Sequence, residues 1–248
     1  MTAAIRAELL KIRTTRLWWG LLLAALGLVV LGVVFSALGA GEANAGPGLD
    51  TAEGVRNVVA AAGGGYVFTL VLGVMGSAGE YRHQTVTSTL LAVPRRTRVV
   101  LAKLAAYAVA GFGFALVCVG VGVAIALPLL SARDADMDLL DLRAQVPALL
   151  AGTTLYALIG VAVGSLVRNL VAAVIGALVW VWVIEALLVL LLPEVGRWLP
   201  GGAANAMLQA ATIRGELLQP WAGALLFFAY TVVLTVAAAF TTVRRDVT

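Results

Sequence analysis

The stretch LWWGLLLAALGLVVLGVVFSALG, residues 17–39, decides the fold class, because it runs its whole length without a charged side chain. A helix needs roughly 20 apolar residues to cross the hydrocarbon core of a bilayer. Basic residues precede the stretch, as they do in a signal peptide, but the apolar part of a signal peptide has only ~7–15 residues. The length of residues 17–39 therefore predicts a retained membrane-spanning helix.

The composition of the whole chain also indicates a membrane protein surrounded by lipid. Apolar residues make up 62% of the 248 residues and charged residues 12%, and the mean hydropathy is +1.01. Soluble domains have about 45–50% apolar and about 25% charged residues. The net charge of +4 does not indicate nucleic-acid binding, because long apolar runs separate the basic residues. The only cysteine, Cys118, lies in an apolar run and is interpreted as a packing residue.

Five further apolar runs have the length of a span. The predicted fold is therefore an all-α integral membrane protein with a single transmembrane domain over residues 1–248 and with spans at residues 17–39, 58–78, 104–130, 146–167, 170–192 and 221–243. Only Arg168 and Asn169 separate the fourth span from the fifth, which predicts a tight helical hairpin.

Basic residues predict the orientation, because cytoplasmic loops carry the excess of Lys and Arg. One side of the predicted spans collects twelve basic residues: Arg6, Lys11, Arg13, Arg16, Arg82, Arg95, Arg96, Arg98, Lys103, Arg168, Arg244 and Arg245. The other side has five: Arg56, Arg133, Arg143, Arg197 and Arg214. We expect the first side to be cytoplasmic, and an even number of spans then places both termini there.

The N-terminal segment, residues 1–16, is predicted to be an amphipathic helix in the membrane interface. Ile5, Leu9 and Ile12 recur at helical spacing, whereas Glu8 and Lys11 take other faces. An apolar stripe with basic flanks is typical of a helix that lies on a membrane. The alternative is a polar tail whose arginines only set the topology.

The loop at residues 79–98, GEYRHQTVTSTLLAVPRRTR, carries the most informative pattern. Glu80 is expected at the beginning of a helix, where a negative charge favours the helix dipole. Leu90, Leu91 and Val93 are apolar residues in an otherwise polar loop, and Pro94 ends the segment. Such residues need a cover, which is either the lipid surface or a soluble partner.

This pattern resembles the first cytoplasmic loop of type 2 ATP-binding-cassette (ABC) transporter permeases, commonly written E-x-x-x-G-T, L-L, P-x-x-R and K. The matching residues are Glu80, Thr85, Leu90, Leu91, Pro94 and Lys103, whereas Gln84 stands where glycine is usual. The resemblance implies that the loop is a coupling helix held by a separate ATPase subunit. The residues to which it assigns that contact are Glu80, Tyr81, Arg82, His83, Gln84, Thr85, Leu90, Leu91, Pro94, Arg95 and Arg96.

The same resemblance implies a dimer, with a second copy of the chain or a paralogous permease as the other half. Residues 193–219 form an outer segment with few polar residues. This segment resembles the short re-entrant helices that such permeases place before their last span. Within it, Ala203–Thr212 is long enough for two or three helical turns, and the alternative is an irregular loop.

The sequence contains no recognisable motif for nucleotide binding, catalysis or metal binding. The two lysines, Lys11 and Lys103, do not follow a glycine, so the P-loop pattern does not occur. ATP and magnesium are therefore expected on the partner ATPase. His83, the only histidine, has no metal-ligand partners at usable spacing and no plausible nucleophile, so no catalytic residue and no metal site is predicted. The acidic run 134–141 lacks the glycine and glutamate that a helix–loop–helix calcium site requires.

Glu185 is the one acid inside a predicted span. A carboxylate there costs roughly 2.5–3.5 kcal/mol on insertion scales, so it should face protein or water. The functional hypothesis is a polar contact in a substrate path or a proton-linked switch; the alternative is a hydrogen bond to a neighbouring helix or to a dimer partner. Trp180 and Trp182 lie too deep for an interfacial belt and are interpreted as packing or cavity residues. Gly160 and Gly164, four residues apart, predict close helix packing, and so do Gly63–Gly65.

Taken together, these expectations describe the permease subunit of an ABC exporter in a bacterial cell membrane, moving a hydrophobic or amphipathic cargo such as a drug, antibiotic or lipid. The alternative function is a polytopic channel or a membrane assembly factor that works without an ATPase.

Overall fold

The computed structural model describes residues 2–42, 47–82, 96–137, 140–210 and 215–244, and the regular structure in these ranges is helical throughout. The helices are α1 (Thr2–Thr14), α2 (Leu17–Gly39), α3 (Ala52–Ala60), α4 (Tyr66–Arg82), α6 (Arg96–Ala132), α7 (Leu142–Val167), α8 (Leu170–Val179), α9 (Glu185–Leu191), α10 (Pro193–Gly196), α11 (Pro200–Leu208) and α12 (Pro220–Arg244). Within the described ranges, six helical segments are long and apolar enough to cross a membrane. For the described residues, the prediction of an all-α fold with six candidate membrane-spanning helices is confirmed.

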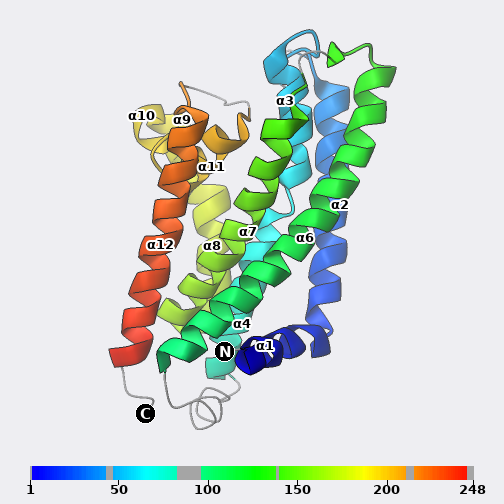
Figure 1. Ribbon diagram of the computed structural model, residues 1–248. Helices are drawn as coiled ribbons and strands as arrows, with labels where there is room; N and C mark the ends of the chain where they lie inside the picture. Colours follow the sequence, from blue (N-terminus) through cyan, green and yellow to red (C-terminus); the bar gives the residue numbers. More distant parts are fainter. Residues whose placement is uncertain (1, 43–46, 83–95, 138–139, 211–214, 245–248) are drawn as a thin grey trace.

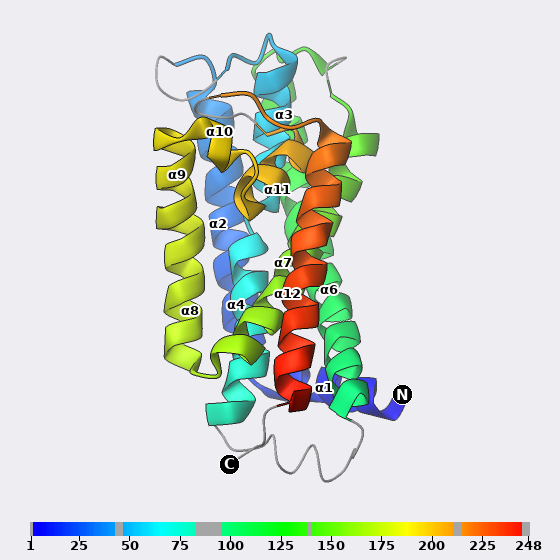
Figure 2. The ribbon, with the colours of Figure 1, turned by 90° about the vertical axis from the view of Figure 1, so that its left-hand side faces the viewer.

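The long helices run side by side, and α1 lies across one end of the bundle (Figure 1). Here α4 and α12 end and α6 begins, and we call this the terminal end. The opposite end, which we call the far end, carries α3 and the short helices α10 and α11 (Figure 2). The two ends therefore hold different sets of polar residues, separated by the apolar length of the bundle.

The second span differs most from its predicted bounds of 58–78. It begins at Ala52 and is interrupted by a short 3-10 turn, Ala61–Gly63, before α4 starts at Tyr66. Glycine destabilises a regular helix, and here it also permits close contacts. A Cβ atom on Gly63 would lie 2.6 Å from the side chain of Leu149, and one on Gly65 would lie 2.9 Å from the Cys118 sulfur. The glycine run thus breaks the span while letting its neighbours approach.

Other bounds also differ from expectation. The third span, predicted at residues 104–130, is a helix over Arg96–Ala132, because adding residues to a helix that the apolar run has already formed costs little compared with starting one. The helix predicted at Ala203–Thr212 begins at Pro200 and ends at Leu208, where Gln209 adopts a left-handed conformation with φ of 52°. Proline favours the first turn of a helix, which explains the earlier start.

Helices α4 and α7 pack closely through glycine, as the sequence predicts for Gly160 and Gly164. A Cβ atom on Gly160 would lie 2.1 Å from the carbonyl oxygen of Leu70, and one on Gly164 would lie 2.5 Å from that of Val74. Side chains larger than glycine would force the two backbones apart. The pair forms the centre of the bundle, with buried Leu70 and Val74 between them.

Several polar residues of the connections complete helix ends. Arg133 donates hydrogen bonds of 2.9 and 2.8 Å to the carbonyl oxygens of Ala37 and Leu38, which lie at the C-terminal end of α2. Asp141, from the acidic run, accepts from the backbone of Arg143 and Ala144 at the start of α7. These contacts satisfy backbone groups that a helix leaves unpaired at its ends.

Candidate functional site

Four charged side chains meet at the terminal end and form what we call the ionic cluster: Glu8, Lys11, Glu80 and Lys103. The Lys103 ammonium lies 2.9 Å from Glu80 and 3.1 Å from Glu8. The Lys11 ammonium lies 2.8 Å from Glu80 and 2.5 Å from Glu8. Each lysine therefore contacts both carboxylates, and the charges of the four groups balance.

The ionic cluster joins three helices that are distant in sequence. Glu8 and Lys11 come from α1, Glu80 from the last turn of α4, and Lys103 from the N-terminal part of α6. Lys103 also donates a hydrogen bond of 3.0 Å to the carbonyl oxygen of Gly76 in α4. The loop at residues 83–95 leaves from α4 and returns to α6, so the cluster ties together the two helices that flank it.

Glu80 thus occupies a different place from the one predicted. The sequence pattern placed it at the beginning of a helix, but it lies near the end of α4, which stops at Arg82. A carboxylate at this end opposes the helix dipole. Lys11 and Lys103 offset this unfavourable interaction, because both form ion pairs with Glu80. Only 9% of the Lys103 side chain and 14% of the Glu80 side chain are exposed. Ion pairs in such surroundings are screened much less than surface pairs.

Lys11 is the most exposed member of the ionic cluster. Burial lowers the pKa of its ammonium group, but the hydrogen bonds with Glu8 and Glu80 outweigh burial and raise that pKa above the ordinary value of 10.5. The group therefore stays charged across the physiological pH range, and the cluster does not behave as a proton switch at Lys11.

The residue after Glu80 extends the connection to the other side of the bundle. The Arg168 guanidinium lies 5.1 Å from the centre of the Tyr81 ring, within the range of a cation–π contact. Arg168 occupies the turn between α7 and α8 in a left-handed conformation, and donates to the carbonyl oxygen of Thr241 in α12. The end of α4 is therefore linked through Tyr81 to the α7–α8 turn and to α12.

The remaining residues predicted to contact an ATPase fall mostly in the loop. His83, Gln84, Thr85, Leu90, Leu91, Pro94 and Arg95 lie outside the described residues. Arg82 is exposed at the end of α4, and Arg96 is the first residue of α6. The described part of the predicted coupling segment consists of its two flanks, and these are held by the ionic cluster.

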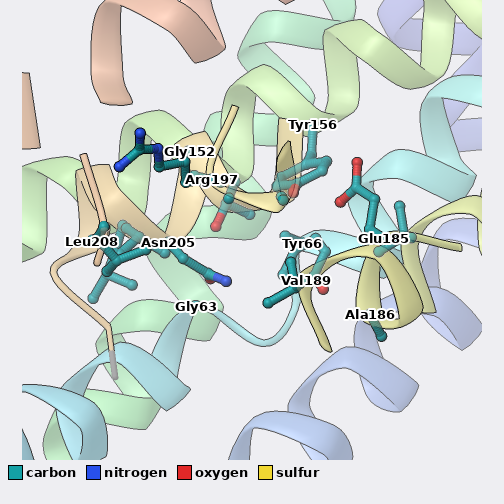
Figure 3. A pocket seen from close by; sticks show the side chains of 18 of the residues that line it. Gly63, Tyr66, Gly152, Tyr156, Glu185, Ala186, Val189, Arg197, Asn205 and Leu208 are labelled. Atoms are coloured by element: carbon teal, nitrogen blue, oxygen red, sulfur yellow. The ribbon is translucent and has the colours of Figure 1, made fainter. Parts of the chain in front are cut away.

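A cavity of about 270 Å³ lies at the far end, enclosed by α4, α7, α9 and the segment that contains α10 and α11. We call it the far cavity. Tyr66 and Tyr156 form part of its wall, with Glu185 beside them and Arg197 and Asn205 toward the opposite side (Figure 3). The two tyrosine rings lie 4.5 Å apart between centroids, and Tyr156 also contacts Phe227 at 4.8 Å. An aromatic wall and one buried carboxylate thus characterise the cavity.

Glu185 is 5% exposed, and its carboxylate accepts two hydrogen bonds from neutral donors. Trp180 donates its indole N–H to Oε1 at 2.7 Å, and the backbone N–H of Gly201 in α11 donates as well. Helix α11 has no side-chain cap of its own at Leu199. Glu185 therefore supplies from another helix the acceptor that the first turn of α11 lacks.

A π-helical turn, Trp180–Ile184, makes the Trp180 contact possible. Residues five apart point in different directions on an α-helix, but the i to i+5 bonding of a π turn brings them to one side. The backbone N–H of Glu185 bonds the carbonyl of Trp180, and their side chains meet directly. Trp182 in the same turn hydrogen-bonds Tyr66. Trp180 and Trp182 are 41% and 54% exposed and are not among the described lining residues, so they are hydrogen-bond partners of the cavity wall and not the buried packing residues that the sequence predicted.

Comparison with protein-family models matches residues 4–200 to the ABC-2 family of transporter proteins. The chain belongs to this family. The matched region contains every member of the ionic cluster and also Glu185. No match was found among curated proteins.

Two parts of this ABC-2 family protein were missed by sequence reasoning. Glu8 and Lys11 were placed on the polar face of the N-terminal helix, although both belong to the ionic cluster. One available signal was the use of lysine at only two of 17 basic positions. Tyr66 and Tyr156 were not singled out, and no local pattern distinguishes them, because the far cavity is assembled from segments far apart in the chain.

Proposed function

We propose that the chain is the membrane-spanning permease subunit of an ATP-driven ABC exporter, with its terminal end in the cytoplasm. Membership of the ABC-2 transporter family supports a permease role. The observation that carries the coupling part of the proposal is the ionic cluster, because it lies where the loop at residues 83–95 enters and leaves the bundle.

Coupling requires that a force on a loop reach the spanning helices. Glu80 and Lys103 lie on opposite sides of the loop and are 2.9 Å apart, so its two ends are linked directly. Lys11 attaches α1 to Glu80 and Glu8 attaches it to Lys103, and Tyr81 contacts Arg168 in the α7–α8 turn. A partner that pushes on residues 79–96 would therefore move α1, α4 and α6 as one unit.

The partner of this proposal is a separate ABC ATPase subunit that holds ATP and magnesium, since the chain has no P-loop. Two permease chains, identical or paralogous, would enclose the transport path in a cell membrane. The apolar faces of the spans favour a hydrophobic or amphipathic cargo. The alternative function remains a channel or membrane assembly factor without an ATPase.

The test is capture of an ATPase by the full chain. We would purify the chain in lipid nanodiscs with ABC ATPases encoded near its gene, and compare Arg82→Glu with Arg143→Glu. Arg82 is exposed beside the loop, whereas Arg143 is exposed at the far end, at the start of α7. We expect Arg82→Glu to reduce ATPase capture at least tenfold and Arg143→Glu to leave it unchanged.

Two outcomes would contradict the proposal. One is recovery of the wild-type chain without any ATPase and without stimulated ATP hydrolysis, which would favour the alternative function. The other is equal capture by both variants, which would remove the terminal end as the contact surface.

A further inference from the structure

We propose that the far cavity binds the cationic head of an amphipathic organic cation, such as a quaternary ammonium compound. The role of this ligand as transported cargo rests on the proposed function; its binding to the chain does not.

The charges that line the far cavity favour a cation. Among the described residues of the lining, Glu185 and Glu216 are acids and Arg197 is the single basic residue. Arg197 is already paired, since its guanidinium lies 2.7 Å from the carboxylate of Glu194. Among the described residues, no salt bridge is formed by Glu185. The cavity therefore contains carboxyl groups whose negative charge, once they are ionised, no described side chain compensates, and a ligand cation would supply the missing partner.

The Glu185 carboxylate has acceptor capacity left for such a ligand. Its hydrogen bonds come from Trp180 and from the backbone of Gly201, both neutral. An ionised carboxylate offers about four acceptor positions, of which the described residues occupy two. The π turn at Trp180–Ile184 and the first turn of α11 fix the group, and this orders the carboxylate before a ligand arrives.

The aromatic wall selects among cations. Tyr66 and Tyr156 line the far cavity and lie close enough to interact with the Glu185 charge. Ring faces beside an acid attract weakly hydrated cations, and quaternary ammonium groups are the usual ligands of such arrangements. At about 270 Å³ the cavity is smaller than the ~300–1,000 Å³ of pockets that enclose whole drug-sized molecules. It therefore fits a head group, and an apolar tail would extend beyond it.

A purely structural role for Glu185 makes a different prediction. If the carboxylate served only to bond Gly201 and Trp180, a glutamine would keep an acceptor oxygen at nearly the same place and would not affect ligand binding. If the negative charge recruits a cation, glutamine would abolish the attraction while leaving the fold intact. Glu185→Gln therefore separates the two roles.

The experiment is calorimetric titration of the full chain in nanodiscs of zwitterionic lipid with benzyltrimethylammonium and with its neutral carbon analogue, neopentylbenzene. We expect the cation to bind at least tenfold more tightly than the neutral compound, and Glu185→Gln to weaken cation binding at least tenfold. Glu42→Gln is the matched control, because Glu42 is an exposed acid outside the cavity lining. It should bind like the wild type.

A second pair of variants keeps the test valid if Glu185→Gln does not fold. Tyr66→Phe keeps the ring and should retain cation binding, whereas Tyr66→Leu removes the ring and should weaken it several-fold. Equal affinity for the cation and the neutral analogue would overturn the proposal. So would unchanged cation binding in both Glu185→Gln and Tyr66→Leu. Neither result would affect capture of an ATPase at the terminal end, so failure here leaves the proposed function standing.

Discussion

At the terminal end, two lysines and two glutamates neutralise one another within 3.1 Å, whereas at the far end the described partners of Glu185 are uncharged N–H groups. Both regions remove carboxylates from water, and in both regions a carboxylate contacts a helix other than its own. They differ in whether the charge is balanced. The ionic cluster is complete as it stands; Glu185 has hydrogen bonds but no counter-ion among the described residues.

This difference shows how buried acids can serve two purposes in one bundle. A balanced cluster resists removal of any member, because the remaining charges stay buried without a partner. It is therefore suited to holding α1, α4 and α6 together while a load is applied. An unbalanced acid in a cavity gains from binding a cation, and is suited to recognition. The variants below test whether the two regions respond in these opposite ways.

The largest effect is expected from Lys103→Met. The substitution leaves a buried acid partly uncompensated, and breaking a buried pair from one side costs about 3–5 kcal/mol. We expect a loss of that size in the free energy of unfolding, measured in nanodiscs or detergent. Lys11→Met is the matched control, since 42% of the Lys11 side chain is exposed, compared with 9% of Lys103. Equal losses for the two variants would contradict the balanced-cluster description.

Gly201→Ala tests how firmly Glu185 is held at the far end. A Cβ atom on Gly201 would lie 2.0 Å from Oε2 of Glu185, so the carboxylate must move away from the backbone N–H. Loss of a buried hydrogen bond costs about 1–3 kcal/mol. We expect a decrease of this size in the free energy of unfolding, together with weaker cation binding.

Gly176→Ala is the control for that substitution, because a Cβ atom there meets nothing within 4 Å. It should stabilise α8 by about 0.5–1 kcal/mol through helix propensity alone. If Gly201→Ala stabilised the chain as Gly176→Ala does, the Glu185–Gly201 contact would not be part of the structure.

Sequence reasoning recovered what depends on residue type along the chain. The apolar run 17–39 and its counterparts predicted six candidate spans. The four-residue spacing of Gly160 and Gly164 predicted close helix packing, and in the structure these glycines lie against the backbone of Leu70 and Val74 in α4. Both features depend on how apolar or small the residues of a single segment are, and these properties can be read locally.

Features that depend on tertiary partners were recovered only in part. Glu80 and Lys103 were singled out through the family resemblance, but their shared contacts with Glu8 and Lys11 were not, since no periodicity links residues 8, 80 and 103. Glu80 was assigned to the wrong end of a helix because an acid is usual at a first turn; the nearby lysines override this preference. The π turn was also missed, because its residues, WVWVI, fit an ordinary apolar helix.

Glu185→Gln should have a small effect on stability, in contrast to the substitutions in the ionic cluster. The amide keeps one acceptor oxygen and removes a buried acid that has no counter-ion among the described residues, so loss and gain largely cancel. We expect the free energy of unfolding to change by less than about 1 kcal/mol, while cation binding is lost. Glu80→Gln, made in parallel, should lose more, because its two lysine partners remain charged. A larger loss for Glu185→Gln than for Glu80→Gln would reverse the comparison between the two ends.

The smallest expected effect concerns pH and Lys11. Its pKa is raised in the folded chain, so its contribution is fully present below the unfolded value of 10.5 and is lost as the pH rises through the higher folded value. Because the side chain is partly exposed, the contribution is about 0.2–1 kcal/mol. The stability difference between the wild type and Lys11→Met should stay constant from neutral pH to the unfolded pKa and then shrink. Lys11→Arg, which stays charged at these pH values, should show no such decline relative to Lys11→Met. A difference that already shrinks well below the unfolded pKa would mean that burial, and not the two glutamates, controls the charge of Lys11.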